Sequence, residues 1–248
     1  MTNPALPVDP EGAAIEVAGR PLRPQPRVYL LLNKPRGPLS TAHDPRGRRT
    51  VLDLFGDLRQ RLYPAGRLDA DTEGLLIITN DGDLTLRLTH PRYAVEKVYE
   101  AQVKGRPTAG ALTRLGRGVT LTDGPTGPAR VRVLQVGPET SCIELTVHSG
   151  RKRMVRRMLE AVGHPAVSLV RTRIGPLILG NLRPGEWREL TKEEVAGLRG
   201  VAAHRPRTAR KPTPVSAGAA QNKAAPAREG GGRPTRARPF GCAQGKRR

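Results

Sequence analysis

GRLDADTEGLLIITNDGDL, residues Gly66–Leu84, places a polar loop, an apolar run and a turn in one short stretch of the chain. The apolar run Leu75–Thr79 predicts a buried strand, because it is continuous and is closed by the turn sequence NDG at residues 80–82. The preceding residues 66–74 carry no such pattern and predict a loop that enters the strand. This stretch therefore indicates a sheet with a long polar loop at one strand end.

Further strand and helix patterns lie on both sides of this stretch. Val28–Leu32 is another continuous apolar run, and Lys97–Val103 alternates with a period of two. The same alternation recurs in Arg130–Val136 and in Cys142–Val147. Helical patterns cover Asp83–Leu88, Thr108–Leu115, Arg151–Val162 and Thr191–Leu198. Because these elements follow no regular βαβ repeat, we predict an α+β fold around a mostly antiparallel sheet.

The charge of the chain points to a polyanionic partner. Its 248 residues include 43 Lys and Arg against 22 Asp and Glu, which gives a formal net charge of +21. Each Lys or Arg placed on a phosphate releases condensed counterions, so such a surplus favours nucleic acid. No run approaches the roughly 18 consecutive apolar residues of a membrane helix, and the first residues do not resemble a secretory signal. We expect a cytoplasmic protein that does not enter a membrane and acts as a monomer.

Composition divides the chain into three parts. Residues 1–26 are rich in proline, with one strand-like piece at Ala14–Val17, and residues 27–198 hold the other predicted elements. Val201–Arg248 contains 12 Lys and Arg and a single acid among Pro, Ala and Gly. Burial of these few apolar residues cannot offset the conformational entropy that the segment would lose on ordering. We therefore predict a disordered basic tail over residues 199–248. This tail either adds non-specific affinity for RNA or only solvates the chain.

Three acids, Asp69, Asp71 and Glu73, gather in the loop before the predicted strand. They match the first positions of an EF-hand calcium loop, but the twelfth position is Asn80 rather than a bidentate Glu. A strand also follows where the second helix of an EF-hand would begin. The simpler interpretation of the spacing alone is a polar loop whose side chains satisfy backbone donors.

A second unusual segment is the basic helix predicted over Arg151–Val162. Its apolar side chains fall on one face at helical spacing, which predicts a core-facing stripe: Met154, Val155, Met158, Leu159 and Val162. Arg153 and Arg157 point away from this stripe, which favours a solvated position for Arg153. Arg156 lies on the border of the stripe, where an arginine can reach into a cleft while its stem packs on apolar neighbours.

Several common site patterns are missing from the sequence. Two cysteines far apart and five histidines without HxH or HxxxH spacing do not support a metal site. There is no GxSxG, Walker-type loop or GxGxxG sequence, so nucleotide hydrolysis and hydride transfer lack their usual signals. We therefore expect neither a metal nor a small-molecule cofactor.

Taken together, these segments resemble the RsuA/RluB family of ribosomal RNA pseudouridine synthases, most closely the RluB type that acts on the large subunit. The sequence GRLDxxTxGLL is a specific signature of that family. The matching blocks follow the family's order: LLNKPRG at Leu31–Gly37, GRLDADTEGLLIITNDGDL at Gly66–Leu84, THPRYAVEKVYE at Thr89–Glu100, GRKRMVRRMLEAVGHP at Gly150–Pro165, LVRTRIGPL at Leu169–Leu177 and LRPGEWREL at Leu182–Leu190.

The resemblance implies a fold, a partner and an activity. The fold is a central, mostly antiparallel mixed sheet in two halves, flanked by helices, with the active-site cleft across it. The partner is ribosomal RNA. The family breaks the N-glycosidic bond of a uridine, turns the uracil and rejoins it through a ring carbon, without cofactor, metal or energy source.

The resemblance also implies roles for individual residues. Asp69 would be the catalytic carboxylate, with Arg156 beside it, and an arginine in that position favours the charged form of a buried carboxylate. Tyr99 would pack against the everted base, and stacking of this kind contributes about 1–3 kcal/mol. The substrate-binding residues implied are Tyr99, Arg156, Ile174, Arg67 and Lys97.

The N-terminal part departs from the family pattern. Family members usually begin with a small helical RNA-binding module, and here only its last strand is recognisable, in Asp9–Leu22. An alternative to the enzyme is a non-catalytic RNA-binding or ribosome-assembly protein on the same scaffold. The intact set of Asp69, Tyr99 and Arg156 argues against that alternative, because binding alone does not require an acid in a cleft that faces phosphates.

Overall fold

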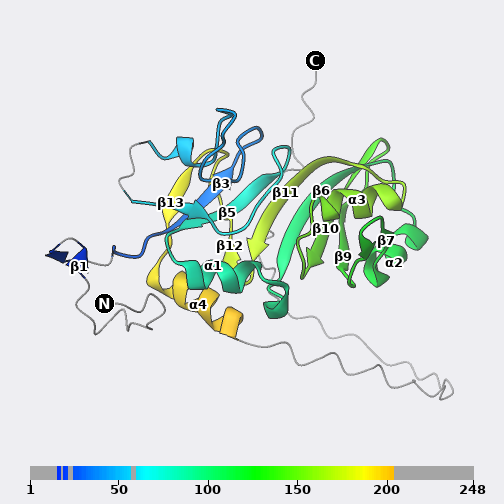
Figure 1. The fold of residues 1–248 in the computed structure, drawn as a ribbon. Helices are drawn as coiled ribbons and strands as arrows, with labels where there is room; N and C mark the ends of the chain where they lie inside the picture. The colour runs from blue at the N-terminus through cyan, green and yellow to red at the C-terminus, as the bar shows by residue number, and fades with distance from the viewer. Residues whose placement is uncertain (1–15, 18, 22–24, 57–59, 204–248) are drawn as a thin grey trace, which may run out of the picture.

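A computed structural model of the chain describes residues 16–17, 19–21, 25–56 and 60–203 (Figure 1). The strand piece predicted at Ala14–Val17 lies partly outside these residues, but Glu16–Val17 form strand β1, which pairs with β2 (Arg20–Pro21). The basic tail from residue 204 onward lies outside the described residues. No helix in the described part of the chain is long and apolar enough to cross a membrane.

The central feature of the fold is a nine-stranded sheet with the order β13-β3-β5-β11-β6-β10-β9. Strand β4 adds to β5, and β12 adds to β11. The strands are β13 (Trp187–Glu189), β3 (Tyr29–Lys34), β5 (Glu73–Thr79), β11 (Ala166–Ile174), β6 (Lys97–Lys104), β10 (Thr140–Val147), β9 (Arg130–Gln135), β4 (Tyr63–Pro64) and β12 (Leu177–Ile178). Only β5 and β11 pair in parallel, so the predicted mostly antiparallel mixed sheet is confirmed.

Helices cover both faces of this sheet (Figure 1). They are α1 (Gly82–Thr89), α2 (Ala109–Arg117), α3 (Met154–Ala161) and α4 (Lys192–Ala203), with 3-10 turns at Leu52–Leu54 and Pro91–Tyr93 and a small β7–β8 hairpin (Thr120–Leu121 and Gly124–Pro125). Helix α4 continues to Ala203, past the predicted domain end at residue 198. Helix α3 begins at Met154 rather than at Arg151, because Arg153 adopts the left-handed conformation, with φ of +51°, which a helix cannot continue through.

Two apolar cores explain why the strands nearest the site are continuous apolar runs. Along β3, Leu30 and Leu32 belong to the core cluster that also includes buried residues of α2 and α3, whereas Leu31 belongs to the cluster that includes residues of α1 and α4. Along β5, Leu76 and Ile78 enter the first core, and Leu75 and Ile77 enter the second. A strand buried on both faces needs apolar residues at every position, as parallel-type strands do. The loop before β5 is therefore attached to a rigid strand.

Gly74 lies where the two halves of the sheet meet. It pairs with Arg171 across the parallel β5–β11 contact. Its φ is +106°, and a Cβ built there would lie 2.3 Å from the backbone oxygen of Arg171. Neither condition admits a side chain, so Gly74 both permits this strand contact and fixes the end of the Gly66–Thr72 loop against β11.

We expect Gly74→Ala to destabilise the fold by about 2–5 kcal/mol, from roughly 1–2 kcal/mol of backbone strain and 1–3 kcal/mol of overpacking. Urea unfolding of the full chain measures this change. Gly127→Ala is the matched control, because nothing lies within 4 Å of its Cβ position and no positive φ is recorded there. Equal unfolding midpoints for the two variants would contradict the close approach at Gly74.

A buried acid makes the stability of the sheet depend on pH. Glu100 on β6 lies opposite Glu144 on β10, and its Oε2 is buried with no hydrogen-bond partner among the described residues. Burial, followed by the charge of Glu144, raises the pKa of Glu100 from 4.5 to about 7, although Arg132 opposes the shift. The folded state therefore holds a proton that the unfolded state releases, and stability falls as the pH rises from 4.5 to 7.

We expect Glu100→Gln to be more stable than the parent chain at pH 8 and equal to it below about pH 4.5. The gain at pH 8 should be about 1–2 kcal/mol, below the roughly 3 kcal/mol that a shift of this size gives without solvent screening. Urea unfolding at pH 5, 6, 7 and 8 measures it, with the exposed Glu139→Gln as a control. A gain that is the same at every pH would exclude Glu100 as its cause.

Candidate active site

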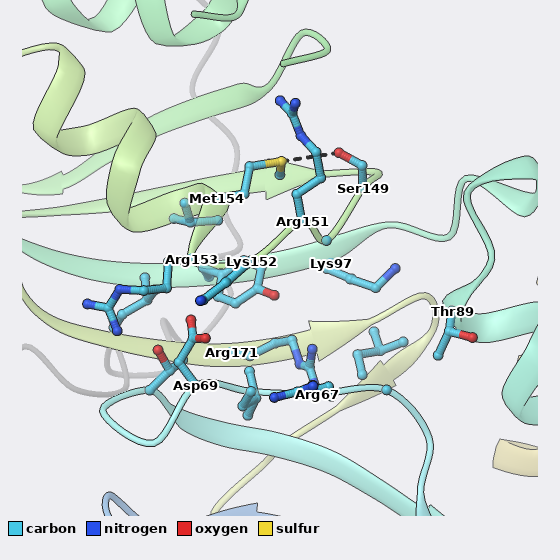
Figure 2. Close-up of a pocket in the computed structure, with 18 of the residues that line it drawn as sticks. Arg67, Asp69, Thr89, Lys97, Ser149, Arg151, Lys152, Arg153, Met154 and Arg171 are labelled. Carbon is cyan, nitrogen blue, oxygen red and sulfur yellow. Dashed lines mark hydrogen bonds between the residues drawn. The ribbon is translucent and has the colours of Figure 1, made fainter. Parts of the chain in front are cut away.

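A cavity of about 420 Å³ opens beside the loop that enters β5. Its wall is formed by this loop, by strands β6 and β11, and by the turn that leads into α3 (Figure 2). All six site residues predicted from the sequence line this one cavity: Arg67, Asp69, Lys97, Tyr99, Arg156 and Ile174. Sequence segments far apart therefore converge on a single hollow, with Asp69 among them.

The backbone of the loop is held from beneath by Lys34 at the end of β3. Its side chain is fully buried, and its Nζ donates to the backbone oxygens of Pro35 at 3.0 Å, Thr72 at 3.1 Å and Asp69 at 3.2 Å. Burial lowers the pKa of Lys34 to about 8, while nearby carboxylates raise it in part. Ser40 adds a second anchor, because its Oγ donates to Leu68 O and accepts from Leu68 N. The backbone of the loop is thus fixed from below.

A cluster of two arginines ties the same loop to α3. Arg153 donates to both carboxylate oxygens of Asp71, at 3.0 and 2.9 Å. Arg156, whose side chain is 11% exposed, donates from Nη2 to Asp71 O at 2.7 Å, and its Nε lies 3.3 Å from Asp71 Oδ2. These two arginines hold the pKa of Asp71 below its usual value against the opposing effect of burial, which is the largest single influence on it. Asp71 is therefore the link between the loop and the helix.

This cluster corrects one prediction. Arg156 was expected to pair with Asp69, but its ion pair is with Asp71, because the left-handed turn at Arg153 and the start of α3 direct both arginines to that acid. Arg153 was expected to be solvated, and its side chain is 44% exposed, but it also binds Asp71 and lines the cavity. Asp71 is also unsuited to the calcium interpretation, since both its carboxylate oxygens already accept from Arg153.

Asp69 differs from Asp71 in its surroundings. Among the described residues, its carboxylate makes neither a hydrogen bond nor an ion pair, and only its backbone oxygen accepts, from Lys34 and from Thr72 N. Figure 2 shows the carboxylate directed into the cavity on the side where Arg153 lies. A partly buried carboxylate with both oxygens unoccupied is free to act on a bound molecule.

The opposite part of the wall is apolar. Tyr99 on β6 is 7% exposed, and Ile174 on β11 is 2% exposed, with Leu169 and Val155 adding buried surface. The antiparallel register of β6 and β11 places Tyr99 opposite Arg171 and Lys97 opposite Ile174. An aromatic ring beside aliphatic side chains suits a flat heterocycle, because the heterocycle can stack on the aromatic ring while the edge of the heterocycle remains polar.

Known proteins are similar to this chain in sequence. A family model described as RNA pseudouridylate synthase matches residues 28–161. The ribosomal large subunit pseudouridine synthase B of Bacillus subtilis is 47% identical over 77% of this chain and 79% of its own length. This chain belongs to the RNA pseudouridylate synthase family. It is therefore an RNA pseudouridine synthase, and the predicted family and enzyme class are confirmed.

Other relatives of this pseudouridine synthase agree. The ribosomal large subunit pseudouridine synthase E of Vibrio vulnificus is 40% identical over 66% of this chain and 76% of its own length. A crystal structure of a pseudouridylate synthase superposes with a TM-score of 0.64 at 33% identity, over 70% of this chain and 74% of that one. The fold is thus that of the family, as predicted.

Two residues that shape the site of this pseudouridine synthase, Lys34 and Arg171, were not singled out from the sequence. Lys34 stood within LLNKPRG, which was interpreted as the end of a strand and as a block of the family resemblance, with no role given to the lysine. Arg171 stood within LVRTRIGPL, three residues before the predicted Ile174, and is only 3% exposed in the structure. In both cases the signal available was a charged residue inside or beside an apolar run, which requires a specific buried partner.

Proposed function

We propose that this protein converts uridine in the RNA of the large ribosomal subunit to pseudouridine, with Asp69 as the catalytic carboxylate. One observation carries the proposal. Among the residues that line the cavity, Asp69 alone is acidic, and seven others are cationic: Arg67, Lys97, Arg151, Lys152, Arg153, Arg156 and Arg171. A binding protein for RNA has no need of an unpaired carboxylate in such a cavity, because an acid repels phosphate.

The geometry suggests how the residues divide the work. The cations at the rim attract the RNA backbone, and the target nucleotide has to leave its helix to reach the cavity. Tyr99 and Ile174 then face the base from the apolar wall, which recovers part of the stacking lost on eversion. Asp69 meets the nucleoside with both oxygens unoccupied, where it can attack the ribose, take its proton or add to the base.

The role of Tyr99 gives a graded prediction. If its ring stacks on the base, Tyr99→Phe should keep activity within a few-fold, whereas Tyr99→Ala should lose about 10–100-fold, from stacking worth roughly 1–3 kcal/mol. Initial rates of pseudouridine formation at subsaturating RNA measure both variants. Equal losses would assign the role to the hydroxyl instead of the ring.

The substrate is proposed from the names of the relatives in Bacillus subtilis and Vibrio vulnificus, which refer to the large ribosomal subunit. Pseudouridine mapping in ribosomal RNA from cells with and without this gene tests it. We expect at least one large-subunit pseudouridine to disappear and to return with the parent gene but not with Asp69→Asn. Loss confined to the small subunit would contradict the proposed substrate, and no loss would contradict the proposed function.

We also propose that the protein acts as a monomer in the cytoplasm, where ribosomal RNA is available. Light scattering during gel filtration should give the mass of a single chain, 26.8 kDa. A stable dimer at micromolar concentration would contradict this. Fractionation of cells that carry the tagged chain should place it with soluble ribosomal material.

A further inference from the structure

The cations that line the cavity fall into two groups. Three of them form ion pairs with acids of the same chain: Arg151 pairs with Asp123, and Arg153 and Arg156 share Asp71. The other four form no ion pair within the described residues: Arg67, Lys97, Lys152 and Arg171. Positive charges gathered in a partly closed cavity without counter-charges repel one another, so an anion that enters relieves that repulsion.

Arg171 is the deepest of these four. Its side chain is 3% exposed, its Nε donates to Leu75 O at 2.8 Å, and its Nη2 is buried with no hydrogen-bond partner in the described part of the chain. Nearly all buried donors in folded proteins are paired, so an unpaired guanidinium N–H in the wall of a cavity points to an acceptor that arrives from outside. The guanidinium of Arg171 is not deprotonated in proteins, so it keeps its positive charge in the cavity wall.

Lys97 lies close enough to Arg171 to be affected by its positive charge. Its Nζ donates to one backbone oxygen, Val95 O, at 3.1 Å. Burial and the charge of Arg171 lower the pKa of Lys97 to about 8, and Lys97 forms no ion pair with an acid among the described residues. In the view of Figure 2, Arg67, Arg171 and Lys97 lie toward Thr89, on the other side of the cavity from Arg153 and the Asp69 carboxylate.

We propose that Arg171, Lys97 and Arg67 form an anion-binding subsite that holds a phosphate group attached to the target nucleoside, so that the nucleoside is oriented toward Asp69. This inference rests on the proposed function, because it takes uridine in RNA as the substrate. A phosphodiester in RNA carries one negative charge and several oxygens that accept from guanidinium and ammonium groups, whereas a uracil carbonyl has no charge. Separation of the subsite from Asp69 is required, because a carboxylate close to a phosphate would weaken its binding.

The test compares ligands that differ only in phosphate. Isothermal titration of the full chain uses uridine, 5′-UMP, 3′-UMP and inorganic phosphate. We expect at least one of the two monophosphates to bind about 10-fold or more tightly than uridine, in line with charge-assisted bonds to Arg and Lys. Inorganic phosphate should compete with that monophosphate. Equal affinity for uridine and both monophosphates, or no competition by phosphate, would overturn the proposal.

Variants assign the preference to these residues. Lys97→Met and Arg171→Met should each bring the monophosphate affinity to within about 3-fold of that for uridine, while uridine binding itself is kept. Lys104→Met on the same strand as Lys97, and Arg173→Met on the same strand as Arg171, should keep the full preference, because neither side chain lines the cavity. If Arg171→Met does not fold, Lys97→Met decides, and an unchanged preference in that variant would overturn the proposal.

The binding test and the activity test have separate outcomes. Titration requires no isomerisation, so a preference for monophosphate that depends on Lys97 supports the subsite even if no pseudouridine forms. Pseudouridine formation without such a preference refutes the subsite alone and leaves the proposed function intact. Full-length RNA provides a further check, because Lys97→Met should raise KM more than it lowers kcat.

Discussion

Asp69→Asn should abolish pseudouridine formation and leave RNA binding within a few-fold of the parent chain. The substitution keeps the size of the side chain and removes the charged oxygens that face the cavity without a partner among the described residues. Loss of an essential acid–base group or nucleophile lowers turnover by about 10²–10⁴-fold or more. The measurement is single-turnover formation of pseudouridine in a large-subunit RNA fragment, with binding followed by filter retention.

Two controls separate chemistry from structure. The backbone oxygen of Asp69 accepts a hydrogen bond from Lys34, and Asn keeps that oxygen. The free energy of unfolding should therefore stay within about 0.5 kcal/mol of the parent value. Asp83→Asn removes an exposed acid in the first turn of α1, away from the cavity, and should keep full activity. Activity of Asp69→Asn equal to that of Asp83→Asn would refute the catalytic assignment.

Local patterns in the sequence were sufficient for much of the fold. The continuous runs of β3 and β5 predicted buried strands, and the alternation of β6 and β10 predicted further strands of a mostly antiparallel sheet. Strand β11 was not predicted. Its register against β6 shifts between Ala166 and Ser168 and again between Arg171 and Arg173, so its side chains do not follow a strict period of two. A pattern search depends on that period and therefore misses an irregular central strand.

The candidate site divides in the same way. Asp69, Tyr99 and Ile174 lie in the cavity as the family resemblance implied. The pairing of Arg153 and Arg156 with Asp71 depends on a left-handed residue and on the contact of two segments about 80 residues apart. Neither feature has a local signal, since φ above zero at an arginine carries no sequence mark and long-range contacts follow from packing. The sequence thus named the proposed reacting groups more readily than the groups that would position them.

Arg156→Ala should lower kcat by about 10²-fold, the loss expected when a reacting group is displaced by about 1 Å. The variant removes the bond from Nη2 to Asp71 O and the contact of Nε with Asp71 Oδ2, so the loop between Asp69 and Gly74 keeps only the Arg153 pair of its two ties to α3. Arg156→Lys should recover only part of the activity, because an ammonium cannot reproduce two directed guanidinium bonds. Initial rates over a range of RNA concentrations separate kcat from KM.

The neighbouring arginine on α3 supplies the control for this prediction. Arg157 pairs with Asp123 at 2.9 Å and does not line the cavity, so Arg157→Ala should weaken the fold without the loss in kcat. A double-mutant cycle with Asp71→Asn then tests the mechanism, because residues that act through one contact are not additive. If Arg156 positions Asp69 through Asp71, the loss in the double variant should be clearly smaller than the product of the two single losses, although Asp71→Asn also weakens the pair with Arg153. Fully additive losses would mean that Arg156 acts on the substrate directly, and that the loop holds Asp69 in place without it.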